Sequence, residues 1–238
     1  ALPSACVIAI DLPGHGLSSH RALDASYDFP RWLPDIAHVI NALAIEKVDL
    51  LGHSLGGAIA TSVAAVFPER VRTVVTVDAL GPLSAKDLGV TKQLKASFET
   101  TQACLSKPLR MFPDTNAMQS RLQVAVPGLT NEAAAHLIRG GARLMSDEGA
   151  TWRYDPRLRA RSGTSLTEPQ VLQLLSDIEC PVLMVRPEPG YPYCKVIYEK
   201  RIATVANLRV EQISGPHHVH LTDPNSVMRT IFDSEIWQ

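Results

Sequence analysis

The sequence predicts an α/β fold in which a mostly parallel sheet is covered by helices on both faces. Short apolar runs of strand length alternate along the chain with longer stretches of helical periodicity. Parallel strands need such crossovers, whereas antiparallel neighbours can be joined by tight turns. The short runs are also apolar throughout rather than alternating with polar residues, as expected for strands that are buried on both faces.

The expected elements follow one another in the order β-α-β-α-β in the first third of the chain. Strands are expected at residues 6–10, 48–51 and 71–77, and helices at residues 32–43 and 55–67. The same alternation returns near the end of the chain. There, strands are expected at 181–186 and 208–213, and helices at 191–206 and 224–232.

The strand signal is absent between residues 78 and 178, and the patterns there predict helices. These helices are expected at 84–105, 116–126, 131–145 and 171–175. The stretch is too long for a single crossover, so it predicts an inserted helical cap. We therefore expect a core formed by residues 1–78 and 179–238, and a cap formed by residues 79–178.

Composition excludes several classes of function. Apolar residues make up 45% of the 238 residues, and the formal net charge of −1 gives no reason to expect nucleic acid or an anionic membrane as partner. No apolar run is long enough to span a membrane. The four cysteines form no CxxC pair, so we predict free thiols, no zinc site and no cofactor. Without a signal peptide or address motif, a cytoplasmic location is expected.

Residues 52–56 carry the pattern Gly-x-Ser-x-Gly, with a predicted strand directly before it and an alanine-rich helix directly after it. This strand-turn-helix setting is typical of a nucleophile elbow, in which Ser54 would be the nucleophile. The turn is tight, so Gly52 and Gly56 are expected to be required for their small size. The backbone N–H of Leu55 would donate one hydrogen bond to an oxyanion. His53 occupies a variable position and is interpreted as structural or pocket-lining.

Three segments together resemble the α/β-hydrolase superfamily. They are residues 11–19 (DLPGHGLSS), the elbow itself, and residues 215–220 (GPHHVH). Residues 152–159 (WRYDPRLR) are also similar to the serine hydrolase-like branch of that superfamily. The resemblance spans nearly the whole chain, and it implies an α/β-hydrolase fold with a catalytic triad of serine, histidine and an acid.

The resemblance places the general base in the loop after the last strand. The family pattern there is Gly, any residue, His, and later an acidic residue followed by Pro, and Gly215, His217 and Asp223 fit it. His217 is therefore the predicted base. His218 is less favoured because alternate residues point in opposite directions. A competing interpretation is that the histidines at 217–220 are loop or metal-binding residues.

The acid has two candidate positions. In most of the superfamily it follows the strand before the last one, but the matching position here is Gly190, and Glu188 lies two residues too early. A second arrangement within the superfamily puts the acid directly after the strand that follows the elbow helix, and that residue is Asp78. We predict Asp78, which would orient the imidazole. Glu188 and a site without a functional acid stay open as alternatives.

The start of the chain departs from the family pattern. The sequence begins Ala1-Leu2-Pro3, without a Met, and reaches a predicted strand within a few residues. We expect that the first strands of the sheet, and the His-Gly turn that supplies a second oxyanion donor, are not part of this sequence. The predicted function is hydrolysis of a small ester or related acyl compound through an acyl-enzyme. The alternative is a catalytically impaired hydrolase-like module that binds a ligand.

Overall fold

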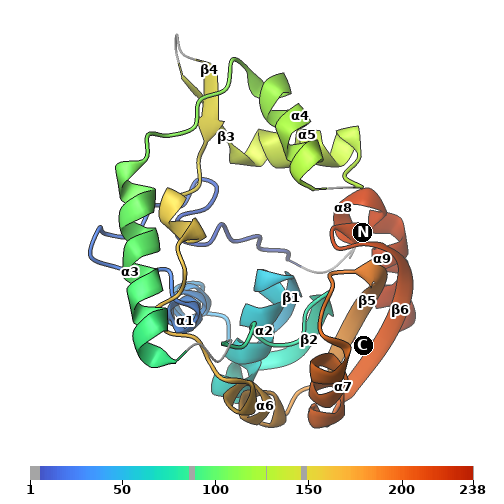
Figure 1. Ribbon diagram of the computed structural model, residues 1–238. Helices are drawn as coiled ribbons and strands as arrows, with labels where there is room; N and C mark the ends of the chain where they lie inside the picture. Colours follow the sequence, from blue (N-terminus) through green and yellow to red (C-terminus); the bar gives the residue numbers. More distant parts are fainter. Residues whose placement is uncertain (1–5, 86–88, 127, 146–148, 238) are drawn as a thin grey trace.

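The computed structural model describes residues 6–85, 89–126, 128–145 and 149–237 (Figure 1). Its main sheet has four parallel strands in the spatial order β1-β2-β5-β6. These strands are β1 (Val48–His53), β2 (Val71–Val77), β5 (Val182–Gly190) and β6 (Leu208–Pro216). A short two-stranded antiparallel sheet lies apart from them. The predicted α/β fold with a parallel main sheet is confirmed.

Helices cover both faces of the main sheet. One face packs on α1 (Trp32–Ala42), α2 (Leu55–Val66), α6 (Glu168–Ser176) and α7 (Lys195–Thr204), and the other packs on α9 (Pro224–Asp233). Side chains of neighbouring residues of β2 point to opposite faces of the sheet, because side chains alternate along a strand. Val74 lies in the cluster with α1 and α2, whereas Val75 packs with Val227 and Ile231 of α9.

The segment between β2 and β5 contributes no strand to the main sheet among the described residues. It contains α3 (Val90–Ser106), α4 (Thr115–Ala125) and α5 (Asn131–Gly141), which lie away from the sheet in Figure 1. Residues 86–88 of the predicted helix 84–105 lie outside the described residues. The later α6 packs Val171 and Leu175 into the core cluster. The assignment of residues 79–178 as a cap domain stays a prediction.

One predicted helix extends too far. The pattern predicted helix over residues 131–145, but α5 ends at Gly141 and residues 142–145 form β3 (Ala142–Met145). This strand pairs antiparallel with β4 (Gly149–Trp152). The glycine pair Gly140-Gly141 explains the end of the helix, since glycine weakens a helix interior and is common where helices stop.

The predicted strand at residues 6–10 is wrong. The segment has no ladder partner and is exposed, with Val7 76%, Ile8 46% and Ile10 41% accessible. An apolar run becomes a strand only where another strand hydrogen-bonds to it, and none of the described strands lies beside this one. In the described part of the chain, β1 is an outer strand of the main sheet, and its Leu51 is 54% exposed.

A buried ion pair ties the segment after β4 to the loop near the start of the chain. Asp155 and Arg157 lie at the short 3₁₀ helix η3 (Pro156–Arg159), and their charged groups are 2.7 Å apart. Arg157 also donates to the backbone carbonyls of Arg21 and Ala22, at 2.5 and 2.8 Å. Tyr27 donates to the Asp155 carboxylate at 2.8 Å. The hydrogen bonds therefore join two segments that are far apart in sequence.

No helix in the described ranges is both long enough and apolar enough to cross a bilayer.

Candidate active site

Ser54 lies at a sharp turn between the end of β1 and the start of α2. Its backbone has φ 51° and ψ −114°, a conformation that is costly for any residue other than glycine. The neighbouring backbone enforces the turn, because a Cβ at Gly52 would lie 2.2 Å from the backbone of Gly56. Ser54 therefore sits in the strand-turn-helix setting that the sequence predicted.

The two glycines of the motif are not equivalent. Among the described residues, a Cβ at Gly56 would meet no heavy atom within 4 Å, so the expectation that this position must be small is wrong. The backbone of Gly56 crowds Gly52, but its own Cβ direction points into open space. The next glycine is more confined, since a Cβ at Gly57 would lie 2.8 Å from the Cβ of Ala79. Gly57 thus allows α2 to approach the end of β2.

The backbone N–H of Leu55 is in a suitable place for an oxyanion. Leu55 is the first residue of α2, and the first N–H groups of a helix have no acceptor within the helix. The helix dipole also favours negative charge at this end. These features agree with the oxyanion role expected for Leu55, which stays a prediction.

His217 directly follows β6 and faces the nucleophile. Its Nε2 lies 3.0 Å from the Oγ of Ser54, and its Nδ1 lies 2.7 Å from Oδ2 of Asp78. An Nδ1–H that donates to the carboxylate leaves the lone pair of Nε2 free to accept the hydroxyl proton. The structure thus brings Ser54, His217 and Asp78 into one hydrogen-bonded chain. Their catalytic roles stay predictions.

Asp78 follows β2 and is held by the segment after β5. Its Oδ2 accepts a second hydrogen bond from the backbone N–H of Tyr191 at 2.7 Å, and its carbonyl accepts one from the Tyr193 hydroxyl at 2.9 Å. The side chain is 3% exposed. Burial raises the pKa of the Asp78 carboxyl, while the hydrogen bonds from His217 and Tyr191 act in the opposite direction.

The other positions considered for the acid, Glu188 and Gly190, do not place a carboxylate at His217. Glu188 is exposed and its carboxylate accepts a hydrogen bond from Gln212. Gly190 is next to the acid, because a Cβ built on it would lie 3.0 Å from Oδ2 of Asp78. Of the two candidate acids, only Asp78 has a hydrogen bond to His217 among the described residues.

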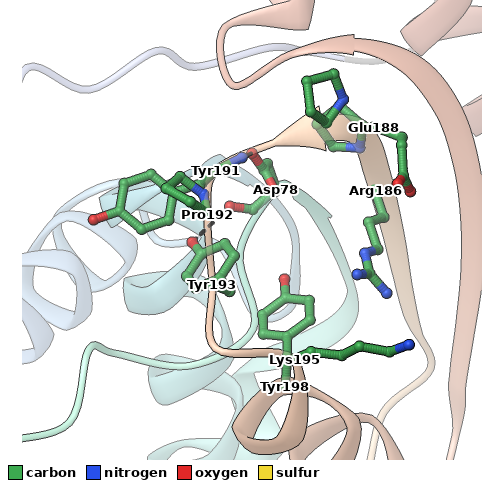
Figure 2. Close-up of a pocket in the computed structure, with 10 residues that line it drawn as sticks. Asp78, Arg186, Glu188, Tyr191, Pro192, Tyr193, Lys195 and Tyr198 are labelled. Atoms are coloured by element: carbon green, nitrogen blue, oxygen red, sulfur yellow. Dashed lines mark hydrogen bonds between the residues drawn. The ribbon is translucent and has the colours of Figure 1, made fainter.

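A cavity of about 130 Å³ lies beside Asp78 (Figure 2). Figure 2 shows Arg186 and Glu188 on β5 at one side of it, and Tyr193 and Tyr198 near Asp78 at the other. Neither Ser54 nor His217 lines this cavity. The cavity is therefore bordered by the acid but not by the nucleophile or the base.

His53, the variable residue of the elbow, is packed among the other histidines. Its Nε2 donates to the backbone carbonyl of His217 at 2.8 Å, and its ring centroid lies 4.0 Å from that of His220. Burial lowers the pKa of His53 to about 3 and that of His220 to about 4, with a smaller effect from neighbouring histidines. Burial also lowers the pKa of His218. All three rings are therefore uncharged at neutral pH.

The sequence does not predict that these histidines form one cluster. Its patterns indicate a structural or pocket-lining role for His53, and a metal-binding role for the histidines at 217–220 only as the interpretation that competes with His217 as the base. The sequence does contain a signal for the cluster. One histidine, His53, directly precedes the predicted nucleophile, and two further histidines, His218 and His220, follow the predicted base. The two segments lie at the end of β1 and directly after β6, and these parallel strands have their C-terminal ends on the same side of the sheet, where the site lies.

Comparison with known proteins agrees with this arrangement. Residues 1–140 match the family described as alpha/beta hydrolase fold. The chain is 30% identical over 236 residues to a serine hydrolase-like protein of Danio rerio, covering 95% of this chain and 72% of that protein. A hypothetical protein of Pseudomonas aeruginosa PAO1 has a similar structure, with a TM-score of 0.87 and 27% identity over 95% of this chain and 80% of that one.

A thioesterase domain from the curacin biosynthetic pathway is also similar in structure. The TM-score is 0.78 and the identity 26%, over 93% of this chain and 78% of that domain. The strand order, the turn at Ser54 and the family match all support the same family assignment. The chain belongs to the α/β-hydrolase family, in its serine hydrolase-like branch.

Proposed function

We propose that this hydrolase cleaves a small ester or related acyl substrate through a covalent acyl-enzyme. Ser54 is the nucleophile, His217 the general base, Asp78 the residue that orients the base, and the N–H of Leu55 an oxyanion donor. The observation that chiefly supports the proposal is the continuous set of hydrogen bonds from Ser54 through His217 to Asp78, at 3.0 and 2.7 Å.

The reaction proceeds in two halves. Ser54 Oγ attacks the acyl carbon while Nε2 of His217 takes its proton, and the carbonyl oxygen becomes an oxyanion next to the Leu55 N–H. The intermediate then expels the leaving group, which takes the proton from His217. Water attacks the acyl-serine with His217 as base once more. Release of the acid restores the Ser54 hydroxyl.

Asp78 holds the imidazole ring of His217 in one orientation throughout both halves of the reaction. Its carboxylate accepts from Nδ1 of His217, so Nε2 is the nitrogen that faces Ser54. It also stabilises the imidazolium that forms when the serine proton is transferred. The Tyr191 N–H holds the same carboxylate oxygen, which limits its freedom to rotate.

The substrate class is supported by the named relatives. One similar structure is a thioesterase domain, and a relative in Danio rerio is named serine hydrolase-like. Esters and thioesters both have an acyl carbon that a serine can attack and a leaving group that a protonated histidine can assist. We therefore propose esters and thioesters of small acids as the substrates to test first.

A fluorophosphonate probe tests the proposal, because it reacts readily only with an activated serine. The chain should take up one probe, and peptide mapping should locate it at Ser54. Ser54→Ala should abolish labelling, and His217→Ala should slow it by about 10⁴-fold or more. Ser176→Ala is the matched control, since Ser176 is exposed at the end of α6. Absence of labelling in the folded chain would favour the alternative, a hydrolase-like module that binds without catalysis.

A further inference from the structure

We propose that His53, His218 and His220 form a binding site for a transition-metal ion such as Zn²⁺, directly beside Ser54 and His217. One ring nitrogen of each of the three residues lies within 4.8 Å of a ring nitrogen of the other two. Three imidazoles suit zinc, copper and nickel ions, and three protein ligands leave room for one exogenous ligand on the metal.

His53 has the hydrogen bond that metal-binding histidines usually make. Its Nε2 lies 2.8 Å from the backbone carbonyl of His217, which can only accept, so Nε2 carries the hydrogen. In the neutral ring with its hydrogen on Nε2, Nδ1 has a free lone pair. A second ring nitrogen that donates to a carbonyl fixes both the tautomer and the orientation of a metal ligand.

His220 has an unused polar atom. Its Nδ1 is buried and has no hydrogen-bond partner in the described part of the chain. Buried side-chain nitrogens without partners are uncommon, and each calls for a physical reason. Coordination of a metal at this nitrogen would satisfy it.

The spacing of the three rings is close to that of a metal site. The ring centroid of His53 lies 4.0 Å from that of His220 and 5.1 Å from that of His218. Two nitrogens that are each about 2.1 Å from a tetrahedral zinc ion lie roughly 3.4 Å apart. Nitrogens separated by up to 4.8 Å therefore have to move closer by up to about 1.4 Å to surround an ion.

The site is coupled to the nucleophile through the chain itself, and this part of the inference rests on the proposed function. His53 directly precedes Ser54, and His218 directly follows His217. Drawing the two rings together on a metal shifts the backbone on both sides of the hydrogen bond between Ser54 and His217. A displacement of reacting groups by about 1 Å costs about 100-fold in rate. Metal binding should therefore lower the reactivity of Ser54.

Isothermal titration calorimetry of the full chain with ZnCl₂, after treatment with a chelator and dialysis, tests the site without any need for activity. We expect one Zn²⁺ per chain. His220→Ala and His218→Ala should each weaken binding by at least about 100-fold, since loss even of an indirect partner of a metal ligand costs 10- to 100-fold. His38→Ala, an exposed histidine on α1, is the matched control and should bind like the parent chain. Circular dichroism verifies that each variant is folded.

Co²⁺ provides a spectroscopic check, because tetrahedral coordination by nitrogen gives visible absorption that His220→Ala should lose. No stoichiometric binding to the folded parent chain, or binding by His218→Ala and His220→Ala as tight as that of the parent chain, would overturn the proposed site. The coupling is tested separately with the fluorophosphonate probe. Saturating Zn²⁺ should slow labelling of the parent chain at least tenfold, and the chelator should restore it. Zn²⁺ binding in calorimetry with unchanged labelling would disprove the coupling alone.

Discussion

The carboxylate of Asp78 lies in close contact with the position that a side chain on Gly190 would occupy. A Cβ at Gly190 would be 3.0 and 3.2 Å from the two carboxylate oxygens of Asp78, and 2.6 Å from the carbonyl oxygen of Pro187. Gly190 is also the position at which the superfamily most often carries its acid. A side chain at position 190 would therefore crowd the Asp78 carboxylate, and the closer contact with Pro187 and the positive φ of Gly190 give further physical reasons for glycine there.

Gly190→Ala should impair hydrolysis, because the new methyl group would push the Asp78 carboxylate away from His217. We expect activity to fall at least tenfold, measured as the rate of fluorophosphonate labelling and as ester turnover. Gly89→Ala is a suitable control. Both glycines have positive φ, 53° and 74°, but a Cβ at Gly89 would meet nothing within 4 Å in the described part of the chain. The positive φ alone should cost Gly190→Ala about 1–2 kcal/mol of stability, and equal activities of the two variants would contradict the steric argument.

Asp78→Asn should nearly abolish turnover, whereas Glu188→Gln should change it little. An amide cannot stabilise the imidazolium and favours the wrong tautomer of the base, which costs about 10⁴-fold in a serine protease. Glu188 is exposed and bonded to Gln212, so its charge does not reach His217. Steady-state ester hydrolysis measures both effects. Near-normal turnover in Asp78→Asn, or a large loss in Glu188→Gln, would show that the acid is assigned wrongly.

The features that sequence could predict are those that depend on neighbours along the chain. A parallel sheet follows from apolar runs that alternate with amphipathic helices, and the turn at Ser54 follows from a strand, a glycine and a helix within a few residues. The resemblance to the superfamily implies an acid directly after the strand that follows the elbow helix, and the position of Asp78 there predicts that it lies at the same end of the sheet as Ser54. The hydrogen bond of Asp78 to His217 agrees with that choice.

The features that sequence could not predict depend on contacts between distant segments. The run at residues 6–10 has the composition of a strand, but its structure depends on whether a partner strand lies beside it. Residues 142–145 continue the pattern of α5 and become a strand only through pairing with residues 149–152. The three histidines of the proposed metal site come from two segments that only the fold brings together, because His53 precedes the nucleophile whereas His218 and His220 follow the base.

Gly52→Ala and Gly56→Ala should differ in their effects on stability and probe labelling, although both change a glycine of the same motif. A Cβ at Gly52 would overlap the backbone of Gly56 at 2.2 Å, so the elbow cannot form without a backbone shift. We expect Gly52→Ala to lose probe labelling and to unfold at lower urea concentration. Gly56→Ala meets open space in a helix and should be neutral or up to about 1 kcal/mol more stable. Urea denaturation and probe labelling measure both, and equal losses would refute this distinction.

Arg157→Met should destabilise the chain by about 3–5 kcal/mol, the usual cost of leaving one charge of a buried pair without its partner. The Arg157 side chain is 6% exposed and holds both Asp155 and backbone carbonyls of the loop at 21–25. Lys195→Met is the control, because the pair of Lys195 with Glu199 is exposed and should contribute less than about 1 kcal/mol. Urea denaturation at neutral pH gives both values. A loss below 1 kcal/mol for Arg157→Met would mean that the ion pair does not hold these segments together.

Asp155 should make part of the stability depend on pH in the acid range. Burial of Asp155 opposes its ionisation, but the hydrogen bonds from Arg157 and Tyr27 outweigh burial, so the pKa of the carboxyl in the folded chain is lowered. In the unfolded chain an aspartate titrates near pH 3.9. A lowered folded pKa means that the contribution is fully present above the unfolded value and is lost as pH falls through the folded one.

The free energy of unfolding of Asp155→Asn should therefore differ most from that of the parent chain at pH 5, and the difference should shrink as the pH is lowered below about 4. Urea denaturation at a series of pH values from about 3 to 6 measures it. Asp24→Asn removes an exposed carboxylate from the loop that Arg157 contacts, and it should change stability little at any of these pH values. A difference between Asp155→Asn and the parent chain that stays constant down to pH 3 would show that ionised Asp155 does not stabilise the fold. In that case the effect of the substitution would come from packing and not from the ion pair with Arg157.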